Sequence, residues 1–230
     1  LVVYLHGGGW TLGSIESFDT VVRALANASG AIVVSVGYRL APEAPFPAGL
    51  EDCLCAVRWL AANAAELGAD PERLAIAGDS AGGNLATVVA RRLRGEVDLR
   101  MQALIYPVTD AGCNTASYGD FGEGHGLTAA SMQRFWNLYL AGADGLDPDA
   151  SPLRAQDLAG SPPAFVLTAG FDPLRDEGEA YCEALRDAGV EAELSRYDGA
   201  IHGFWRWVAA TQLSRIAVDE VAGALRARLA

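Results

Sequence analysis

The chain of 230 residues contains 51% hydrophobic residues and has a formal net charge of −12, with a pI near 4.6. This length fits a single domain that buries roughly 70–75% of its unfolded surface. The acidic balance argues against nucleic acid and anionic membranes as partners, and no apolar run approaches the roughly 18–20 residues of a membrane span. All 17 basic residues are arginines, which excludes Schiff-base, pyridoxal-phosphate and Walker A chemistry that depends on lysine.

The cysteines and histidines indicate reduced thiols and no metal site. Cys53 and Cys55 lie two apart on an expected helix, no C-x-x-C is present, and we predict that all four cysteines, with Cys113 and Cys182, are buried free thiols. Only three histidines occur and none joins a cysteine cluster, so we expect neither a metal nor a cofactor. The chain begins at Leu1 inside an apolar run and without methionine, which we interpret as a truncated start. Our expectation for its location is cytoplasmic.

The first 36 residues predict a strand, a glycine loop, a helix and a second strand. The apolar residues 1–5 are followed at once by the segment 6–10, His-Gly-Gly-Gly-Trp. Three consecutive glycines leave backbone N–H groups uncovered, as an oxyanion hole requires, so Gly7, Gly8 and Gly9 are candidate donors. The next segment, 14–29, predicts a helix that a glycine closes. It is followed by a predicted β-branched strand over 31–36.

A sharp turn from strand to helix is expected at residues 78–82, Gly-Asp-Ser-Ala-Gly. After an expected helix over 50–67, a buried strand over 74–77 runs into this turn, and a helical pattern follows to about residue 94. Strand, G-x-S-x-G and helix together form a nucleophile elbow, whose serine takes strained backbone angles and stands exposed. Ser80 is therefore the candidate nucleophile, and the N–H of Ala81 is a further candidate oxyanion donor.

The alternation of strand and helix breaks between a strand over 102–106 and the next one at 164. The intervening stretch is rich in aromatic residues and holds an amphipathic helix over 128–140. It is too long for a simple crossover, so we predict an inserted helical lid at about 108–162. Its aromatic rings either face a substrate cavity or pack the insertion onto the sheet.

The last third predicts strands over 164–169 and 191–197 and helices over 174–188 and 212–229. The whole chain, 1–230, therefore indicates a single α/β domain with a mostly parallel, doubly wound sheet. Asp172 and His202 each follow the end of a strand, where open α/β sheets place their ligand-binding groups. Ser80, Asp172 and His202 also occur in the chain order of an α/β-hydrolase triad. We predict that Asp172 orients His202 and that His202 is the base for Ser80.

Five segments together resemble the bacterial hormone-sensitive-lipase-like carboxylesterases, also called family IV, and the GDSAG form of the elbow resembles that of one subgroup. The segments are HGGGW at 6–10, YRLAPE at 38–43, GDSAGGN at 78–84, DPLRD at 172–176 and HGF at 202–204. The resemblance implies an α/β-hydrolase fold and cofactor-free hydrolysis of short- to medium-chain esters, with a small-molecule ester as the partner. It implies that Tyr38 and Asp79 support the oxyanion loop and that Trp10, Asp79, Trp136 and Phe204 lie at the substrate. Family members also carry an upstream segment with two strands and N-terminal lid helices, which we expect to be missing here.

Two other classes of function share these motifs. An amidase or peptidase would use the same serine, histidine and aspartate, and comparison of an ester with the matching amide would distinguish it. A non-catalytic binding protein on the same scaffold is known among plant gibberellin receptors, which have lost the histidine that this chain retains at His202. A homodimer through the last strand and helix is one assembly open to the chain.

Overall fold

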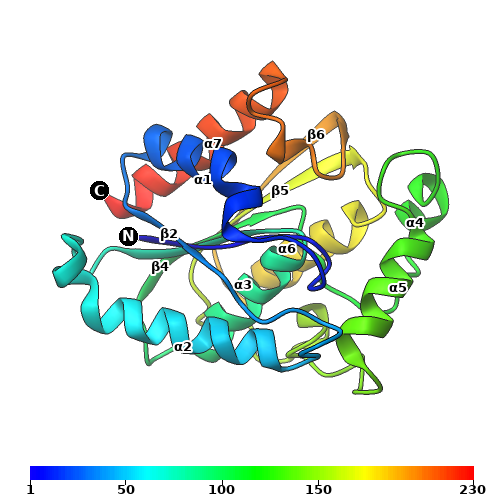
Figure 1. The fold of residues 1–230 in the computed structure, drawn as a ribbon, viewed down its shortest axis with the longest axis horizontal. Coiled ribbons are helices and arrows are strands. Elements are labelled where there is room, and N and C mark those ends of the chain that lie inside the picture. Colours follow the sequence, from blue (N-terminus) through cyan, green and yellow to red (C-terminus); the bar gives the residue numbers. More distant parts are fainter.

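Six parallel strands form one sheet in the computed structural model, which describes residues 1–230 (Figure 1). Their order across the sheet is β2-β1-β3-β4-β5-β6, and every neighbouring pair is parallel. The strands are β1 (Val2–Leu5), β2 (Val33–Val36), β3 (Leu74–Asp79), β4 (Leu99–Ile105), β5 (Ala164–Phe171) and β6 (Ala192–Ile201). The strand order reverses at β1, as in a doubly wound sheet. The predicted α/β fold class is confirmed.

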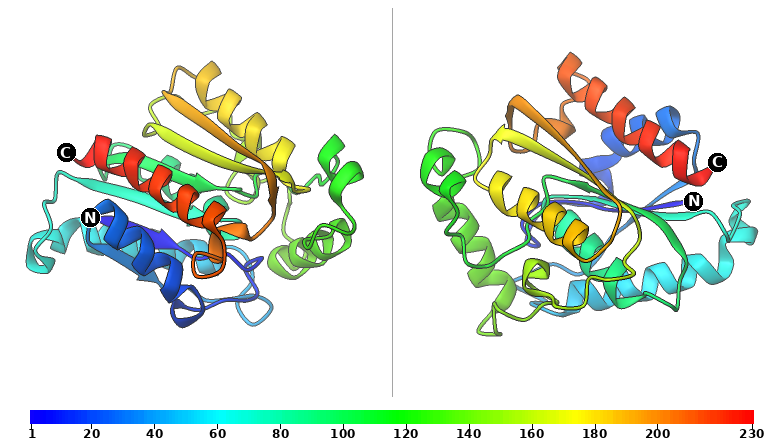
Figure 2. Two further views of the ribbon diagram at one scale, coloured as in Figure 1. Left: turned by 90° about the horizontal axis from the view of Figure 1, so that it is seen from above. Right: turned by 180° about the vertical axis from the view of Figure 1, so that it is seen from behind.

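Helices cover both faces of this sheet (Figure 2). On one face lie α1 (Ile15–Ser29) and α7 (Gln212–Leu229), and on the other lie α2 (Ala48–Asn63), α3 (Ala81–Arg92) and α6 (Arg175–Asp187). Alternate residues of β1 enter the two cores: Val3 and Leu5 pack on the side of α2 and α3, whereas Val2 and Tyr4 pack on the side of α1 and α7. Burial on both faces is the reason that the strands are continuous apolar runs in the sequence.

Local capping and strand pairing fix the ends of these elements. Ser14 and Ser17 exchange the two hydrogen bonds of a capping box at the start of α1, and Gly30 ends it with φ 68°. The helix predicted over 50–67 is instead α2 followed by a 3₁₀ turn, η1 (Ala64–Leu67). Strand β6 extends four residues beyond its predicted end, because Ile201 pairs with Phe171 of β5.

The inserted stretch 108–162 contains two helices and lies beyond the carboxyl ends of the strands (Figure 1). Helix α5 (Ala129–Leu140) matches the predicted helix and is capped by Thr128, which exchanges a capping box with Ser131. Helix α4 (Ala116–Phe121) was not predicted, because six residues are too few to show a helical period. A short 3₁₀ turn, η2 (Pro152–Arg154), precedes the return to the sheet. The lid function of this insertion stays a prediction.

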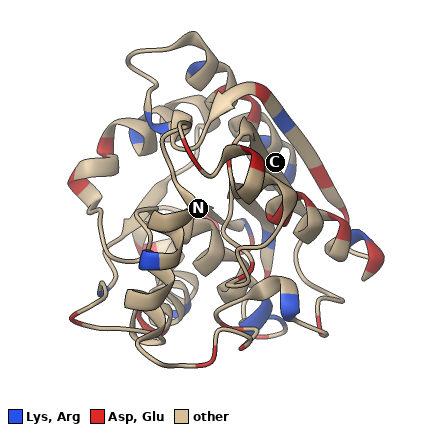
Figure 3. Cartoon of the chain, turned by 90° about the vertical axis from the view of Figure 1, so that its right-hand side faces the viewer, with Lys and Arg blue, Asp and Glu red and all other residues tan.

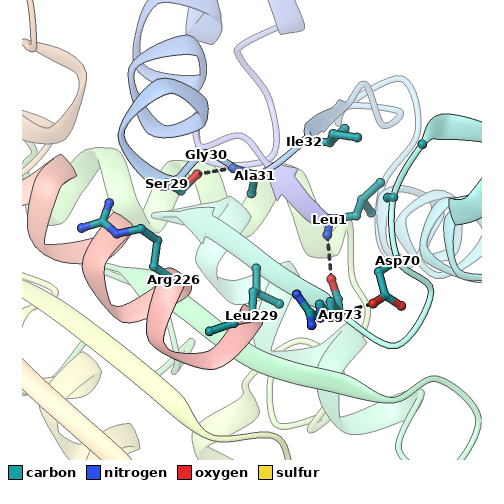
Figure 4. Close-up of a pocket in the computed structure, with 12 residues that line it drawn as sticks. Leu1, Ser29, Gly30, Ala31, Ile32, Asp70, Arg73, Arg226 and Leu229 are labelled. Carbon is teal, nitrogen blue, oxygen red and sulfur yellow. Dashed lines mark hydrogen bonds and ion pairs between the residues drawn. The ribbon is translucent and has the colours of Figure 1, made fainter.

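Acidic and basic segments are interspersed in the side view of Figure 3, and no helix combines the length and apolar character of a membrane span. A cavity of about 420 Å³ lies at the amino-terminal edge of the sheet, lined by Leu1, Arg73 and Leu229 among others (Figure 4). None of the candidate catalytic residues lines this cavity.

The four cysteines are free, as predicted, but they are not all buried. Cys53 and Cys182 are buried, Cys113 is half-buried and Cys55 is exposed. Cys53 and Cys55 lie on the same helix, α2, and two residues turn the helix by about 200°, so the second side chain points away from the core.

Candidate active site

The nucleophile elbow forms where β3 passes directly into α3. Ser80 lies between them with φ 54° and ψ −120°, a left-handed conformation that costs a non-glycine residue roughly 1–3 kcal/mol. A Cβ atom at Gly78 would lie 2.2 Å from the carbonyl oxygen of Gly82, and one at Gly82 would lie 2.0 Å from the carbonyl oxygen of Leu5. The two flanking glycines are therefore required by close backbone contacts, and the Ser80 side chain is held at the tip of the strand.

A continuous line of hydrogen bonds joins the three predicted catalytic side chains. Ser80 Oγ lies 3.0 Å from His202 Nε2, and His202 Nδ1 lies 2.7 Å from Asp172 Oδ2. Since the carboxylate only accepts, Nδ1–H donates to Asp172 and leaves Nε2 free to accept the Ser80 proton. Asp172 is fully buried, and its Oδ1 accepts from the N–H of Leu174 at 2.9 Å.

Strand pairing explains why Asp172 meets His202. The last residues of β5 and β6, Phe171 and Ile201, are paired across the sheet. Asp172 and His202 follow these two paired residues directly, so both side chains emerge at the same edge of the sheet as the elbow. Tyr106, which follows β4, packs against the His202 ring with the two centroids 4.5 Å apart.

The glycine loop after β1 has two free amides and lines the same cavity as Ser80. The N–H groups of Gly8 and Gly9 donate to no acceptor in the chain, and neither does that of Ala81 at the start of α3. The N–H of Gly7 instead donates to Asp79 Oδ1 at 2.9 Å. The prediction of Gly7 as an oxyanion donor is thus corrected: its amide already has a partner, whereas those of Gly8, Gly9 and Ala81 do not.

Asp79 connects this loop to the core of the sheet. It is buried, and the same oxygen, Oδ1, accepts from the hydroxyl of Tyr4 at 2.8 Å and from Gly7 N–H. Trp205 Nε1 donates in turn to the Tyr4 hydroxyl at 3.0 Å. Burial raises the pKa of Asp79 to about 6, although these hydrogen bonds act to lower it. The Tyr38 hydroxyl holds the other side of the loop by donating to the His6 carbonyl at 2.7 Å.

A small cavity of about 140 Å³ opens beside Ser80 and His202. Asp79, Gly8 and Gly9 line it, and the inserted stretch contributes an apolar wall. The wall consists of Leu127, Met132 and Phe135, and the remaining lining residues include Phe18, Gly203 and Arg206. The Phe135 ring packs directly on Gly9, where a Cβ atom would lie 2.4 Å from the ring.

Three of the four predicted substrate-binding residues do not line this cavity. Trp10 and Trp136 are almost fully buried and pack together with Tyr139, on which Trp10 stacks at 4.3 Å. Phe204 is buried against Tyr106 and Tyr197. These rings join the insertion and the last loop to the core, so the prediction is corrected for them, and of the four only Asp79 reaches the cavity. Phe135 is one of the aromatic rings of the insertion that were expected either to face a cavity or to pack on the sheet, and it lines the cavity. Sequence reasoning missed Met132, although it lies on the helix that was predicted.

A buried carboxyl, Glu177, lies in the first turn of α6, five residues after Asp172. Its Oε1 accepts from the N–H of Thr109 at 2.7 Å, while Oε2 is buried without a partner. Burial raises the pKa of Glu177 to about 8, against the lowering effect of the backbone N–H groups of Thr109 and Asp110. The folded protein therefore holds a proton on this carboxyl at pH values where the unfolded chain has lost it.

This proton makes stability depend on pH. Between pH 4.5, the ordinary pKa of glutamate, and about pH 8, the pKa of Glu177 in the folded protein, the folded state binds more protons than the unfolded state. The free energy of unfolding therefore falls as pH rises in this range, by up to about 1.4 kcal/mol per pH unit. We expect Glu177→Gln, which copies the protonated form, to flatten this slope in urea unfolding at pH 5, 6.5 and 8. Glu123→Gln, at an exposed site, is the matched control. Equal slopes in wild type and Glu177→Gln would contradict the expectation.

Comparison with known proteins places the chain in a family. A family profile described as "alpha/beta hydrolase fold" matches residues 2–206. The chain belongs to this family, and its predicted resemblance to the hormone-sensitive-lipase-like carboxylesterases is confirmed. No group of three or more His, Cys, Asp or Glu side chains is arranged to hold a metal ion.

Several relatives carry names that refer to ester hydrolysis. The chain is 47% identical over 210 residues to "Carboxylesterase NlhH" of Mycobacterium tuberculosis and 45% identical over 209 residues to "Ethyl acetate hydrolase" of Pseudomonas putida. Each alignment covers 89% of this chain but only 66% of the relative, so the chain spans a little less than two thirds of their length. Among solved structures, a thermostable esterase from Pseudomonas putida ECU1011 matches with a TM-score of 0.96 and 41% identity, over 100% of this chain and 74% of that one. A hyperthermophilic esterase from the archaeon Pyrobaculum calidifontis matches with a TM-score of 0.95 and 48% identity, over 100% and 77%.

Proposed function

We propose that this chain is a serine carboxylesterase that acts on small carboxylic esters through an acyl-enzyme intermediate. The observation that carries the proposal is the hydrogen-bonded line from Ser80 through His202 to Asp172, set beside a cavity with free glycine amides. The names of the relatives support an ester as the substrate class, and one of them is named for ethyl acetate.

Each step of the reaction would use a group at the site. His202 Nε2 takes the proton of Ser80 as its oxygen attacks the ester carbonyl, and Asp172 stabilises the imidazolium that forms. The oxyanion is received by the N–H groups of Gly8, Gly9 and Ala81, each of which typically contributes roughly 2.7–4 kcal/mol. His202 then protonates the leaving alcohol, and it activates the water that hydrolyses the acyl-enzyme. The reaction as proposed needs no cofactor.

Asp79 and Tyr38 would act as positioning residues for this oxyanion loop. Neither has to touch the substrate: Asp79 fixes the amide of Gly7, and Tyr38 fixes the carbonyl of His6, at 2.9 Å and 2.7 Å. These two hydrogen bonds hold the peptide group between His6 and Gly7 in place. They thereby help to fix the orientation of the next two amides, those of Gly8 and Gly9. A donor that is held in place before the reaction needs no reorganisation when charge develops.

Amide hydrolysis and ligand binding without turnover are the alternatives to be tested. Four other features also stay predictions: the GDSAG subgroup, the lid role of 108–162, the homodimer through β6 and α7, and the cytoplasmic location. An ester and an amide with the same acyl group, such as 4-nitrophenyl butyrate and 4-nitrobutyranilide, separate the three classes. Faster hydrolysis of the ester supports the proposal, faster hydrolysis of the anilide supports an amidase, and turnover of neither supports a binding protein.

The size of the acyl group is expected to be limited. Each buried methylene adds on the order of 0.8 kcal/mol of binding while room remains, but the cavity of about 140 Å³ is closed on one side by Leu127, Met132 and Phe135. We expect kcat/KM to peak at about four to eight acyl carbons and then to fall steeply, in a series of 4-nitrophenyl esters measured below their micellar limits. A rate that still climbs for the longest soluble chains, or that jumps at a lipid interface, would contradict this expectation.

A further inference from the structure

One arginine lines the catalytic cavity without a carboxylate partner. Arg206 ends the 3₁₀ turn η3 (Phe204–Arg206), four residues after His202, and lines the same cavity as Ser80 and His202. Its guanidinium lies over the Phe18 ring, 4.3 Å from the ring centre, and one N–H group donates to the Ser17 carbonyl at 3.4 Å. Most other arginines of the chain pair with Asp or Glu, but no acidic side chain lies within ion-pair distance of Arg206.

The acidic groups of the site are already engaged elsewhere. Asp172 accepts from His202 and from the N–H of Leu174, and Asp79 accepts from Tyr4 and Gly7. Both aspartates are buried, whereas Arg206 is exposed. An acidic chain with a net charge of −12 thus has, in the cavity that contains Ser80, a guanidinium with no ion-pair partner.

The cavity consequently has two chemically different kinds of lining. Leu127, Met132 and Phe135 contribute apolar side chains from the insertion, whereas Arg206, over the Phe18 ring, contributes a cationic side chain. An ester whose carbonyl carbon reaches Ser80 would have both kinds of lining within the same small cavity. A guanidinium that stacks on an aromatic ring keeps its edge N–H groups available, and these bind carboxylates in a bidentate manner.

We propose that Arg206 forms an anion subsite of the catalytic cavity and that preferred substrates are esters carrying a carboxylate on one side of the scissile bond. The proposal rests on the proposed esterase function and adds a substrate class to it. Arg206 is here a specificity-determining residue that contacts the substrate away from the reacting atoms.

Two pairs of matched esters locate the carboxylate. Monoethyl glutarate and ethyl pentanoate, followed in a pH-stat, differ by a carboxylate on the acyl side. 4-Acetoxybenzoate and 4-acetoxybenzamide differ by a carboxylate on the alcohol side. For at least one pair, we expect the wild type to have a higher kcat/KM for the anionic member, and the difference should shrink as salt is added because screening weakens the ion pair. The pair that responds identifies the side.

Three variants test the role of Arg206. In Arg206→Gln we expect the anionic-to-neutral ratio of kcat/KM to fall at least tenfold, mainly through KM, and in Arg206→Lys we expect partial recovery. Arg134→Gln is the matched control, because Arg134 is another exposed arginine without an ion pair, lies on the inserted helix and does not line the cavity. A ratio unchanged in Arg206→Gln for both pairs, or lowered equally in Arg134→Gln, overturns the proposal. A purely structural role for Arg206 would lower both members of a pair alike.

A binding measurement separates this proposal from the proposed function. In Ser80→Ala, calorimetry should show binding of at least one of monoethyl glutarate and 4-acetoxybenzoate, and at least a tenfold loss of that affinity when Arg206→Gln is added. If the neutral esters are hydrolysed but neither the ratio nor the affinity depends on Arg206, only the anion subsite fails. If no ester is hydrolysed while the affinity still depends on Arg206, only the esterase function fails.

Discussion

Alanine at Ser80 or at His202 is expected to lower kcat for ester hydrolysis by roughly 10⁴–10⁶-fold. The two side chains act as one unit, since the serine oxygen is a poor nucleophile until His202 Nε2, 3.0 Å away, takes its proton. The double variant should therefore be no slower than the worse single variant. Steady-state rates with 4-nitrophenyl butyrate measure the effect, and thermal melting reports whether each variant is folded.

Covalent labelling and a control histidine make this prediction specific. A fluorophosphonate should label Ser80 in the wild type, should label no serine in Ser80→Ala, and should react slowly in His202→Ala. His125→Ala is the matched control, because His125 lies on the inserted loop with its Nδ1 2.8 Å from the Glu123 carbonyl oxygen and has no hydrogen bond to Ser80 or Asp172. Retention of wild-type turnover by Ser80→Ala, or a loss in His125→Ala equal to that in His202→Ala, would assign the chemistry to other residues.

The elements of the sheet and the elbow are visible in the sequence because their signals are local. The strand before Ser80 is a short apolar run, and the tight turn needs glycine on both sides within five residues. The pairing of Asp172 with His202 could be predicted only as an order along the chain. The contact itself depends on the register of β5 with β6, where Phe171 pairs with Ile201.

The details that sequence reasoning missed depend on contacts between distant segments. Gly7, Gly8 and Gly9 are equivalent in the sequence, and only the position of Asp79, 72 residues after Gly7, shows that one amide is occupied. Trp10 is buried because Tyr139, from the insertion, stacks on it. Arg206 belongs to no motif, and its place at the cavity follows from the packing of its guanidinium over the Phe18 ring.

Alanine at Gly82 is expected to damage both stability and catalysis, because this glycine is where α3 touches β1. Its Cβ would lie 2.0 Å from the Leu5 carbonyl oxygen and 2.6 Å from that of His6, so the elbow and the oxyanion loop would have to separate by about 1 Å to relieve the overlap. Displacement on this scale typically lowers rates by about 100-fold, and overpacking costs about 1–3 kcal/mol of unfolding free energy.

Gly119→Ala is the control for this prediction and should be neutral or slightly stabilising. Gly119 lies in helix α4, and no heavy atom lies within 4 Å of the added methyl group. Urea unfolding and kcat for 4-nitrophenyl butyrate measure both effects. Wild-type stability and turnover in Gly82→Ala would contradict this expectation. That result would mean that the glycine loop and the elbow are not in direct contact, and that this contact does not set the position of Gly8 and Gly9 relative to Ser80.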